Sequence, residues 1–93
     1  MQKRLIDAQL WNPGDGELNE QNYSNAWRVL ARLGTPYRFG GRAFDGSYEY
    51  LILHPKSGSV IATGRGASTQ RAMFEAALAA QQVLAHEETA VSI

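Results

Sequence analysis

Residues 63–84 read TGRGASTQRAMFEAALAAQQVL, a glycine-rich turn that leads directly into an alanine-rich segment. Ser68 or Thr69 can cap a helix here, because a hydroxyl oxygen accepts hydrogen bonds from the free amides of a first helical turn. At 100° per residue, the apolar positions that follow form one stripe along the helix. This stripe contains Met73, Ala76, Ala77, Ala80, Val83 and Leu84. The segment therefore predicts a closely packed helix that ends at about His86.

Two large apolar residues of this helix, Phe74 and Leu78, lie off the main stripe. Leaving such side chains exposed forgoes about 1.5–3 kcal/mol of burial each. The N-terminal segment can cover them with Leu10 and Trp11. Alternatively, a partner protein or a second copy of the chain covers them. We take Phe74 and Leu78 as a candidate partner or dimer surface, and both interpretations stay open at this point.

A second amphipathic helix is predicted at residues 20–33, where Tyr23, Trp27 and Leu30 recur at helical spacing. Gly34 suits the left-handed position that follows many helices. Pro36 then prevents the helix from continuing.

Three strands are predicted between the two helices. They begin at Tyr37, cover residues 48–53 and cover residues 59–63. The Asp45–Gly46 pair is a strong hairpin signal, because glycine tolerates the positive φ that such turns require. The Gly40–Gly41 pair predicts a bulge or a bend in the first strand.

The predicted fold is an α+β domain of order α-β-β-β-α, with a three-stranded antiparallel sheet and two helices on one face. Residues 1–18 are expected to form an N-terminal arm and residues 19–86 the single domain. Residues 87–93 are expected to form a frayed tail, because Glu87 and Glu88 are unfavourable near a helix C-terminus.

The composition narrows the classes of partner. Nine basic side chains balance nine acidic ones, so the chain lacks the broad positive field that gathers nucleic acid without specificity. The chain contains no cysteine, which excludes disulfides and thiolate zinc sites and fits a reducing compartment. Residues 1–11 do not show the long apolar run of a signal peptide, and no stretch approaches the roughly 20 apolar residues that cross a bilayer. We expect a cytoplasmic protein with no membrane partner.

The charge is nevertheless uneven along the chain. The segment 37–71 carries a net charge of +3, because five basic residues stand against two acidic ones. The basic residues are Arg38, Arg42, Lys56, Arg65 and Arg71, and the acidic ones are Asp45 and Glu49. The segment predicts a modest basic patch, although charges that are merely solvated on strands would give the same pattern.

Tyrosines of the second predicted strand extend this patch. Leu51 and Leu53 share one side of the strand, and two aliphatic side chains favour that side as the core face. Tyr48 and Tyr50 then point outward, where tyrosine and arginine supply much of the energy of protein interfaces and also suit base stacking. Cross-strand pairing that stabilises the sheet is the alternative role. The candidate binding patch consists of Arg38, Arg42, Tyr48, Tyr50, Arg65 and Arg71.

Catalytic and metal sites are not indicated by the sequence. The loop TGRGAST lacks the lysine and the spacing of a phosphate-binding P-loop, so with Arg65 it predicts a weak anion site at most. His54 and His86 lack a second ligand at metal spacing. No local motif holds a hydroxyl, a base and an acid together. We predict a non-enzymatic protein with no catalytic residue, no cofactor and no metal.

The last turn and helix resemble the end of a double-stranded RNA-binding domain, a family with the same α-β-β-β-α order. The resemblance spans about residues 20–85 and rests on the spacing of Gly64, Gly66, Ser68, Ala72, Glu75, Ala76, Ala77 and Ala80. In that family, lysines at the start of the second helix grip the RNA phosphates. Thr69, Gln70 and Met73 stand at those positions here.

The first strand-to-strand loop departs from that family as well, because GGRAFDGS replaces its Gly-Pro-x-His signature. Backbone binding depends mostly on the number of phosphates that cations neutralise. The resemblance therefore implies, as an alternative function, a degenerate duplex-RNA binder that uses Arg65, Arg71 and the loop 40–46 and binds weakly.

The two helices also resemble those of small phage-encoded ABA-sandwich proteins. The matching residues are Ala26, Trp27, Val29 and Leu30 in the first helix, and Ala62, Arg71, Ala72, Ala76, Ala77 and Leu78 toward the end. This resemblance implies a non-enzymatic phage or prophage protein that masks a host protein surface, a class that includes inhibitors of CRISPR defence. We expect a host protein as the partner and a monomer or homodimer as the assembly.

Overall fold

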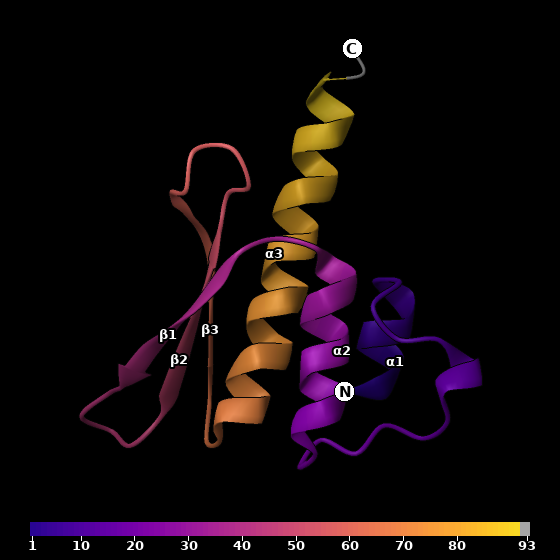
Figure 1. Ribbon diagram of the computed structural model, residues 1–93, viewed down its shortest axis with the longest axis vertical. Helices are drawn as coiled ribbons and strands as arrows, with labels where there is room; N and C mark the ends of the chain where they lie inside the picture. The colour runs from indigo at the N-terminus through magenta and orange to yellow at the C-terminus, as the bar shows by residue number, and fades with distance from the viewer. Residues whose placement is uncertain (92–93) are drawn as a thin grey trace.

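The computed structural model describes the backbone of residues 1–91 and the side chains of residues 1–87 (Figure 1). The helices are α1 (Gln2–Asp7), the 3₁₀ turn η1 (Pro13–Asp15), α2 (Tyr23–Leu33) and α3 (Thr69–Val91). The strands are β1 (Tyr37–Arg42), β2 (Tyr48–Leu53) and β3 (Val60–Gly66). The predicted α+β class and the order α-β-β-β-α are confirmed, with a short N-terminal helix added before them.

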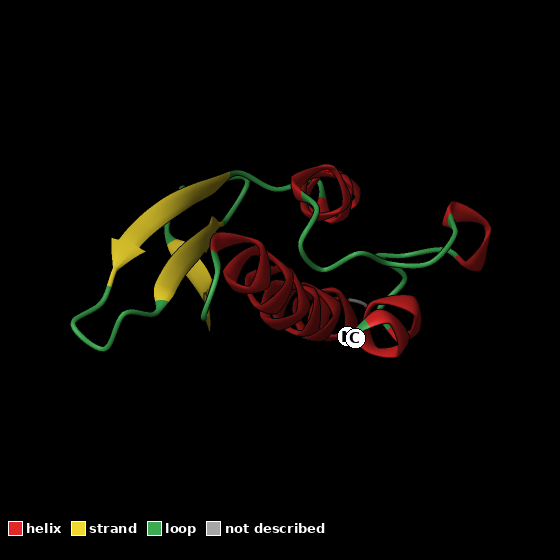
Figure 2. Cartoon of the chain, turned by 90° about the horizontal axis from the view of Figure 1, so that it is seen from below, coloured by secondary structure: helices red, strands yellow, loops and turns green. Residues whose placement is uncertain are grey.

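The three strands form one antiparallel sheet in the order β1-β2-β3, and the helices lie on one side of it (Figure 2). α3 packs directly on β2 and β3, whereas α2 and α1 pack on α3. α3 is therefore the central element, with the sheet on one side and the other helices on the other.

The ends of α2 follow from local chemistry. The Asn22 side chain caps the helix by accepting a hydrogen bond from the Ser24 amide at 2.7 Å. At the other end, Gly34 adopts φ +74° and its amide donates to the Leu30 carbonyl at 3.1 Å. The helix thus ends where glycine and proline predicted, and it begins three residues later than position 20.

α3 approaches β3 closely because Gly64 has no side chain. A Cβ atom at this position would lie 2.0 Å from the Ala76 nitrogen and 2.4 Å from the Ala72 carbonyl oxygen. Ala72, Ala76, Ala77 and Ala80 are all fully buried along α3. Small side chains on both partners therefore let the helix backbone rest on the strand.

The N-terminal segment, residues 1–18, contributes side chains to the hydrophobic core. Leu5 of α1 is buried together with Leu10 and Trp11, and all three belong to the same core cluster as Phe74. Phe74 is fully buried and Leu78 is 9% exposed. The prediction that these two residues form a partner or dimer surface is therefore wrong, because α1 and the residues that follow it cover this side of α3.

Ion pairs hold this segment in place. Arg32 of α2 donates hydrogen bonds to the Asp15 carboxylate from both Nη1 and Nη2, and its Nη2 lies 2.9 Å from Oδ1. The Trp11 indole N–H donates to the Gly16 carbonyl at 3.0 Å, and Arg4 pairs with Glu75 at 2.7 Å. The predicted arm is thus fixed at several points along its length.

The last helix extends beyond its predicted end. α3 continues to Val91, whereas the sequence predicted an end near His86 and a frayed segment at residues 87–93. Positions 92–93 of that predicted tail lie outside the described residues. Within residues 1–91, no helix has the length and the apolarity that crossing a bilayer requires.

Replacing Gly64 with alanine should destabilise the protein by about 3 kcal/mol or more, because the added methyl group would overlap the backbone of α3. Urea denaturation measures this loss. Gly14→Ala is the matched control, since nothing lies within 4 Å of the place that its Cβ atom would take, and it should change the free energy of unfolding by less than about 1 kcal/mol. Equal effects of the two substitutions would contradict the close packing of α3 on β3.

Asp15→Asn should lower the urea midpoint at neutral pH. Hydrogen bonding from Arg32, followed by that from the Asn12 amide, holds the pKa of Asp15 well below its usual value of 3.8. A depressed folded-state pKa stabilises the fold above the unfolded-state value, and this contribution disappears as the pH falls further below about 4. The difference between wild type and variant should therefore shrink at pH 3 and below.

The control for this pH series is Asp7→Asn, because Asp7 is exposed and has no ion-pair partner among the described residues. It should leave the midpoint almost unchanged. A gap between wild type and Asp15→Asn that persists or widens in acid would contradict the role of the carboxylate.

Candidate aromatic binding surface

The register of the sheet determines which side chains face the helices. Directly opposite residues share a face, so Tyr50 lies on the same side as its partners Phe39 and Gly64. Because Gly64 touches α3, this is the inner face. Ile52 lies on it as well and is fully buried.

The prediction that Tyr48 and Tyr50 point outward is therefore wrong. Tyr50 is buried, and Tyr48 is half-buried against the core. The outer face carries Leu51 and Leu53, which are only partly buried. The reason lies in the neighbouring strand, because Gly64 lets α3 pack on this face and the register places Tyr50 directly opposite Gly64.

Six aromatic side chains from three elements lie next to one another and form what we call the aromatic surface. It consists of Tyr23 and Trp27 of α2, Tyr37 and Phe39 of β1, and Tyr48 and Tyr50 of β2. The ring centroids of Trp27 and Tyr37 are 5.5 Å apart, and those of Phe39 and Tyr50 are 5.4 Å apart. Both distances fall in the range that aromatic pairs prefer.

The four residues on α2 and β1 remain open to solvent. Their exposed fractions lie between 41% and 48%. The cause is the unequal cover of the sheet, since α3 packs mainly on β3 and β2 while the connection from α2 passes over α3 to reach β1 (Figures 1 and 2). β1 and α2 thus flank α3, and their rings gather on the side that α3 does not fill.

Two tyrosine hydroxyl groups add polar atoms to this surface. The Tyr23 hydroxyl hydrogen-bonds to the side chain of Thr69, at the start of α3. Burial raises the pKa of the Tyr50 phenol, and the nearby Tyr23 and Tyr37 side chains raise it further. Tyr50 therefore stays neutral at physiological pH and can donate a hydrogen bond.

One cation borders the aromatic surface. The Arg42 guanidinium lies 5.5 Å from the centroid of the Tyr48 ring, a cation–π distance, and its Nε donates to the Gly46 carbonyl. Among the described residues, no carboxylate lies within ion-pair distance of Arg42. This charge is available to a ligand.

The predicted basic patch is divided by the fold. The predicted bulge occurs between Phe39 and Gly41 and inserts one residue, so Arg42 faces inward opposite Tyr48 while Arg38 stays on the outer face. If the strand alternated regularly through Gly40, both arginines would share one face. The six predicted patch residues therefore do not form a single surface.

The other two arginines of that patch are paired with carboxylates. Arg65 lies on the outer face and contacts Glu49 at 3.0 Å. Arg71 lies in the first turns of α3 and contacts Glu20 at 2.9 Å. In the same turn, the Ser68 hydroxyl caps α3 by accepting from the Arg71 amide at 3.1 Å. The loop thus has the hydrogen bonds of an ordinary capped turn.

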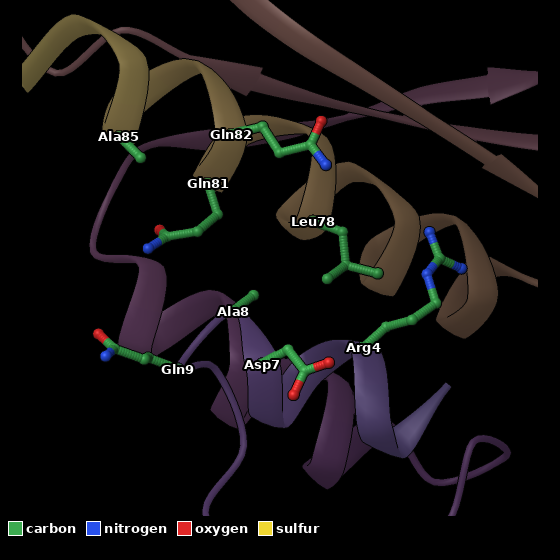
Figure 3. A pocket seen from close by; sticks show the side chains of 8 residues that line it. All are labelled: Arg4, Asp7, Ala8, Gln9, Leu78, Gln81, Gln82 and Ala85. Carbon is green, nitrogen blue, oxygen red and sulfur yellow. The ribbon is translucent and has the colours of Figure 1, made fainter. Parts of the chain in front are cut away.

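A shallow hollow of about 440 Å³ lies between α1 and α3 (Figure 3). It is lined by Arg4, Asp7, Ala8, Gln9, Leu78, Gln81, Gln82 and Ala85. Figure 3 shows mainly amide and small side chains around it, and Arg4 is already paired with Glu75. This hollow presents no nucleophile with an adjacent base.

Both ring nitrogens of His54 are engaged in contacts within the protein. His54 Nδ1 accepts hydrogen bonds from the Lys56 and Ser57 amides, and Nε2 contacts the Glu87 carboxylate at 3.1 Å. The β2–β3 turn is thereby linked to the far part of α3. Within the described residues, no three potential metal ligands come together.

Comparison with protein-family models, with curated proteins and with solved structures finds no match to this chain. The resemblances to double-stranded RNA-binding domains and to phage ABA-sandwich proteins therefore stay predictions.

The two tryptophans should respond very differently to removal. Trp11 is 1% exposed, so Trp11→Ala should lower the free energy of unfolding by about 3–5 kcal/mol. Trp27 is 42% exposed and its ring contacts that of Tyr37, so Trp27→Ala should cost less, about 1–2 kcal/mol. Urea denaturation of both variants provides the comparison. A similar loss in both would mean that Trp27 has a structural role instead of a binding role.

Proposed function

We propose that this chain is a non-enzymatic binding module that masks a surface of a partner protein with its aromatic surface. The observation that carries the proposal is the set of four adjoining rings that are 41–48% exposed, namely Tyr23, Trp27, Tyr37 and Phe39. Aromatic residues and arginine are enriched in protein interfaces, where a few of them supply most of the binding energy. This surface also has an arginine, because the Arg42 guanidinium lies beside the Tyr48 ring.

Sheet stabilisation alone does not account for this arrangement. Cross-strand contacts explain why Phe39 lies beside Tyr50. They do not explain why Tyr23 and Trp27, which belong to a helix, expose nearly half of their rings beside Tyr37. Half-exposed rings forgo part of the burial energy that a core position would supply. A partner that covers them would recover it.

The finer form of the proposal is a phage or prophage protein that masks a host protein, with inhibition of CRISPR defence as one case. Its support is the resemblance of the first helix to phage ABA-sandwich proteins. Trp27, one of the residues that carry this resemblance, is also an exposed member of the aromatic surface. The same residue thus serves both arguments.

Duplex-RNA binding has less support. Its two principal cations, Arg65 and Arg71, are engaged with Glu49 and Glu20. A phosphate would have to displace these carboxylates, and few unpaired cations remain to release counterions. The loop 40–46 contributes Arg42, which lies on the other face of the sheet from Arg65.

Affinity purification with matched variants tests the proposal. Wild type and a Trp27→Ala/Phe39→Ala double variant are expressed with an affinity handle and recovered after nuclease treatment, and their partners are quantified by mass spectrometry. Hot-spot truncations cost about 2 kcal/mol or more each, so the double variant should bind the purified partner more than about hundredfold more weakly.

The control variant is Val60→Ala, because Val60 is 50% exposed on β3 and lies outside the aromatic surface. It should retain the partner. Capture of the same proteins by all three forms would refute the aromatic surface as the binding site. Loss of every partner on nuclease treatment would favour the RNA alternative.

A further inference from the structure

β1 is an edge strand whose outer side has unpaired backbone groups. The Leu53 amide donates to the Pro36 carbonyl at 2.8 Å, which makes these two a hydrogen-bonded pair. Bonded and non-bonded pairs alternate along an antiparallel ladder. Arg38 is therefore bonded to Leu51, whereas the amides and carbonyls of Tyr37 and Phe39 point to the free edge.

The same two residues place their rings on the aromatic surface. Tyr37 and Phe39 thus present free backbone groups at the edge of the sheet and exposed rings beside it. A strand that bonds to these backbone groups would set its own directly opposite side chains against the two rings, because opposite residues share a face. This is the geometry in which an added strand gains affinity from the main chain and specificity from alternate side chains.

We infer that the edge of β1 accepts an extended segment of the partner protein as a fourth strand, and that this segment is acidic. The inference rests on the proposed function and specifies the partner. β1 carries two cations, Arg38 on the outer face and Arg42 on the inner face, and no anion. Among the described residues, neither has a carboxylate within ion-pair distance. Opposite charges across a strand pair stabilise it.

Charge also argues against a second copy of this chain as the occupant. Two β1 strands side by side would bring two copies of Arg38 and two of Arg42 into one short ladder, and like charges across a pair destabilise it. The bulge after Phe39 further interrupts the edge, which limits continuous pairing to the residues before it. The edge suits a short, acidic segment with apolar residues at alternate positions.

A peptide probe tests this chemistry directly. A synthetic heptapeptide that alternates valine with glutamate is titrated into the ¹⁵N-labelled protein, and the Tyr37 and Phe39 amide signals are followed by NMR. These signals should shift, and the two amides should exchange with solvent more slowly. A heptapeptide with lysine in place of glutamate should bind at least tenfold more weakly, because its charged side chains share the outer face with Arg38 and would place like charge beside it.

A third peptide carries the valine–glutamate sequence with N-methylated valines. It keeps the side chains and loses main-chain donors, so it should bind at least about fivefold more weakly. Equal binding of the glutamate and lysine peptides, shifts confined to residues outside β1, or no shift at millimolar peptide would each overturn the inference.

Substitutions at Phe39 separate this inference from the proposed function. Phe39→Ala and Phe39→Pro both remove the ring, but only proline removes the amide at the free edge. Because that amide is outside the β1–β2 ladder, proline is tolerated there as it is on other edge strands. Phe39→Pro should bind the purified partner at least about fivefold more weakly than Phe39→Ala.

Suppose that the two Phe39 variants bind equally and that the Trp27→Ala/Phe39→Ala variant loses the partner. This result would refute strand addition and retain the aromatic surface as the binding site. Retention of the partner by the double variant would refute the proposed function itself. A dimer in sedimentation equilibrium that Phe39→Pro dissociates and Phe39→Ala does not would identify a second copy as the occupant and overturn the inference.

Discussion

The close contact between Gly64 and the backbone of α3 is the constraint on which the rest of the structure depends. Any larger residue would place its Cβ 2.0 Å from the Ala76 nitrogen, so the helix can rest here only on a glycine. The alanines along α3 are fully buried as well, and Phe74 lies in the same core as Trp11. The N-terminal segment closes that core from the side opposite to the sheet.

The same contact explains why one part of the sheet is left uncovered. A helix held tightly over β3 and β2 cannot also cover β1, whose inner face carries Tyr37 and Phe39. α2 reaches only the near end of that face, where Trp27 meets Tyr37. The exposure of the aromatic surface is therefore a consequence of where α3 is anchored, whereas the bulge sets the position of Arg42 and the strand order leaves the edge of β1 open.

Much of the fold could be predicted from local signals. The order of helices and strands was predicted from Gly34 and Pro36, the Asp45–Gly46 hairpin signal and the alanine stripe. The bulge was predicted from the Gly40–Gly41 pair. The faces of β2 could not be predicted from β2 alone, because Leu51 and Leu53 look more apolar than Tyr48 and Tyr50. The deciding residue, Gly64, lies on another strand, and only the register places it opposite Tyr50. For that reason, and because the bulge turns Arg42 away from Arg38, the predicted patch shares only Tyr48, Tyr50 and the bordering Arg42 with the candidate site.

The separation between the α3–β3 contact and the exposed rings has an evolutionary consequence. Positions 23, 27, 37 and 39 contribute little to the packing that holds the helix on the sheet, so they are free to vary while Gly64 and the alanines are not. Under the proposed function, a lineage that carries this fold can therefore exchange those four side chains and change its partner while the packing of α3 on the sheet is kept. Sequence divergence would then concentrate at these exposed positions of α2 and β1, while Gly64 and the buried alanines of α3 stay nearly constant.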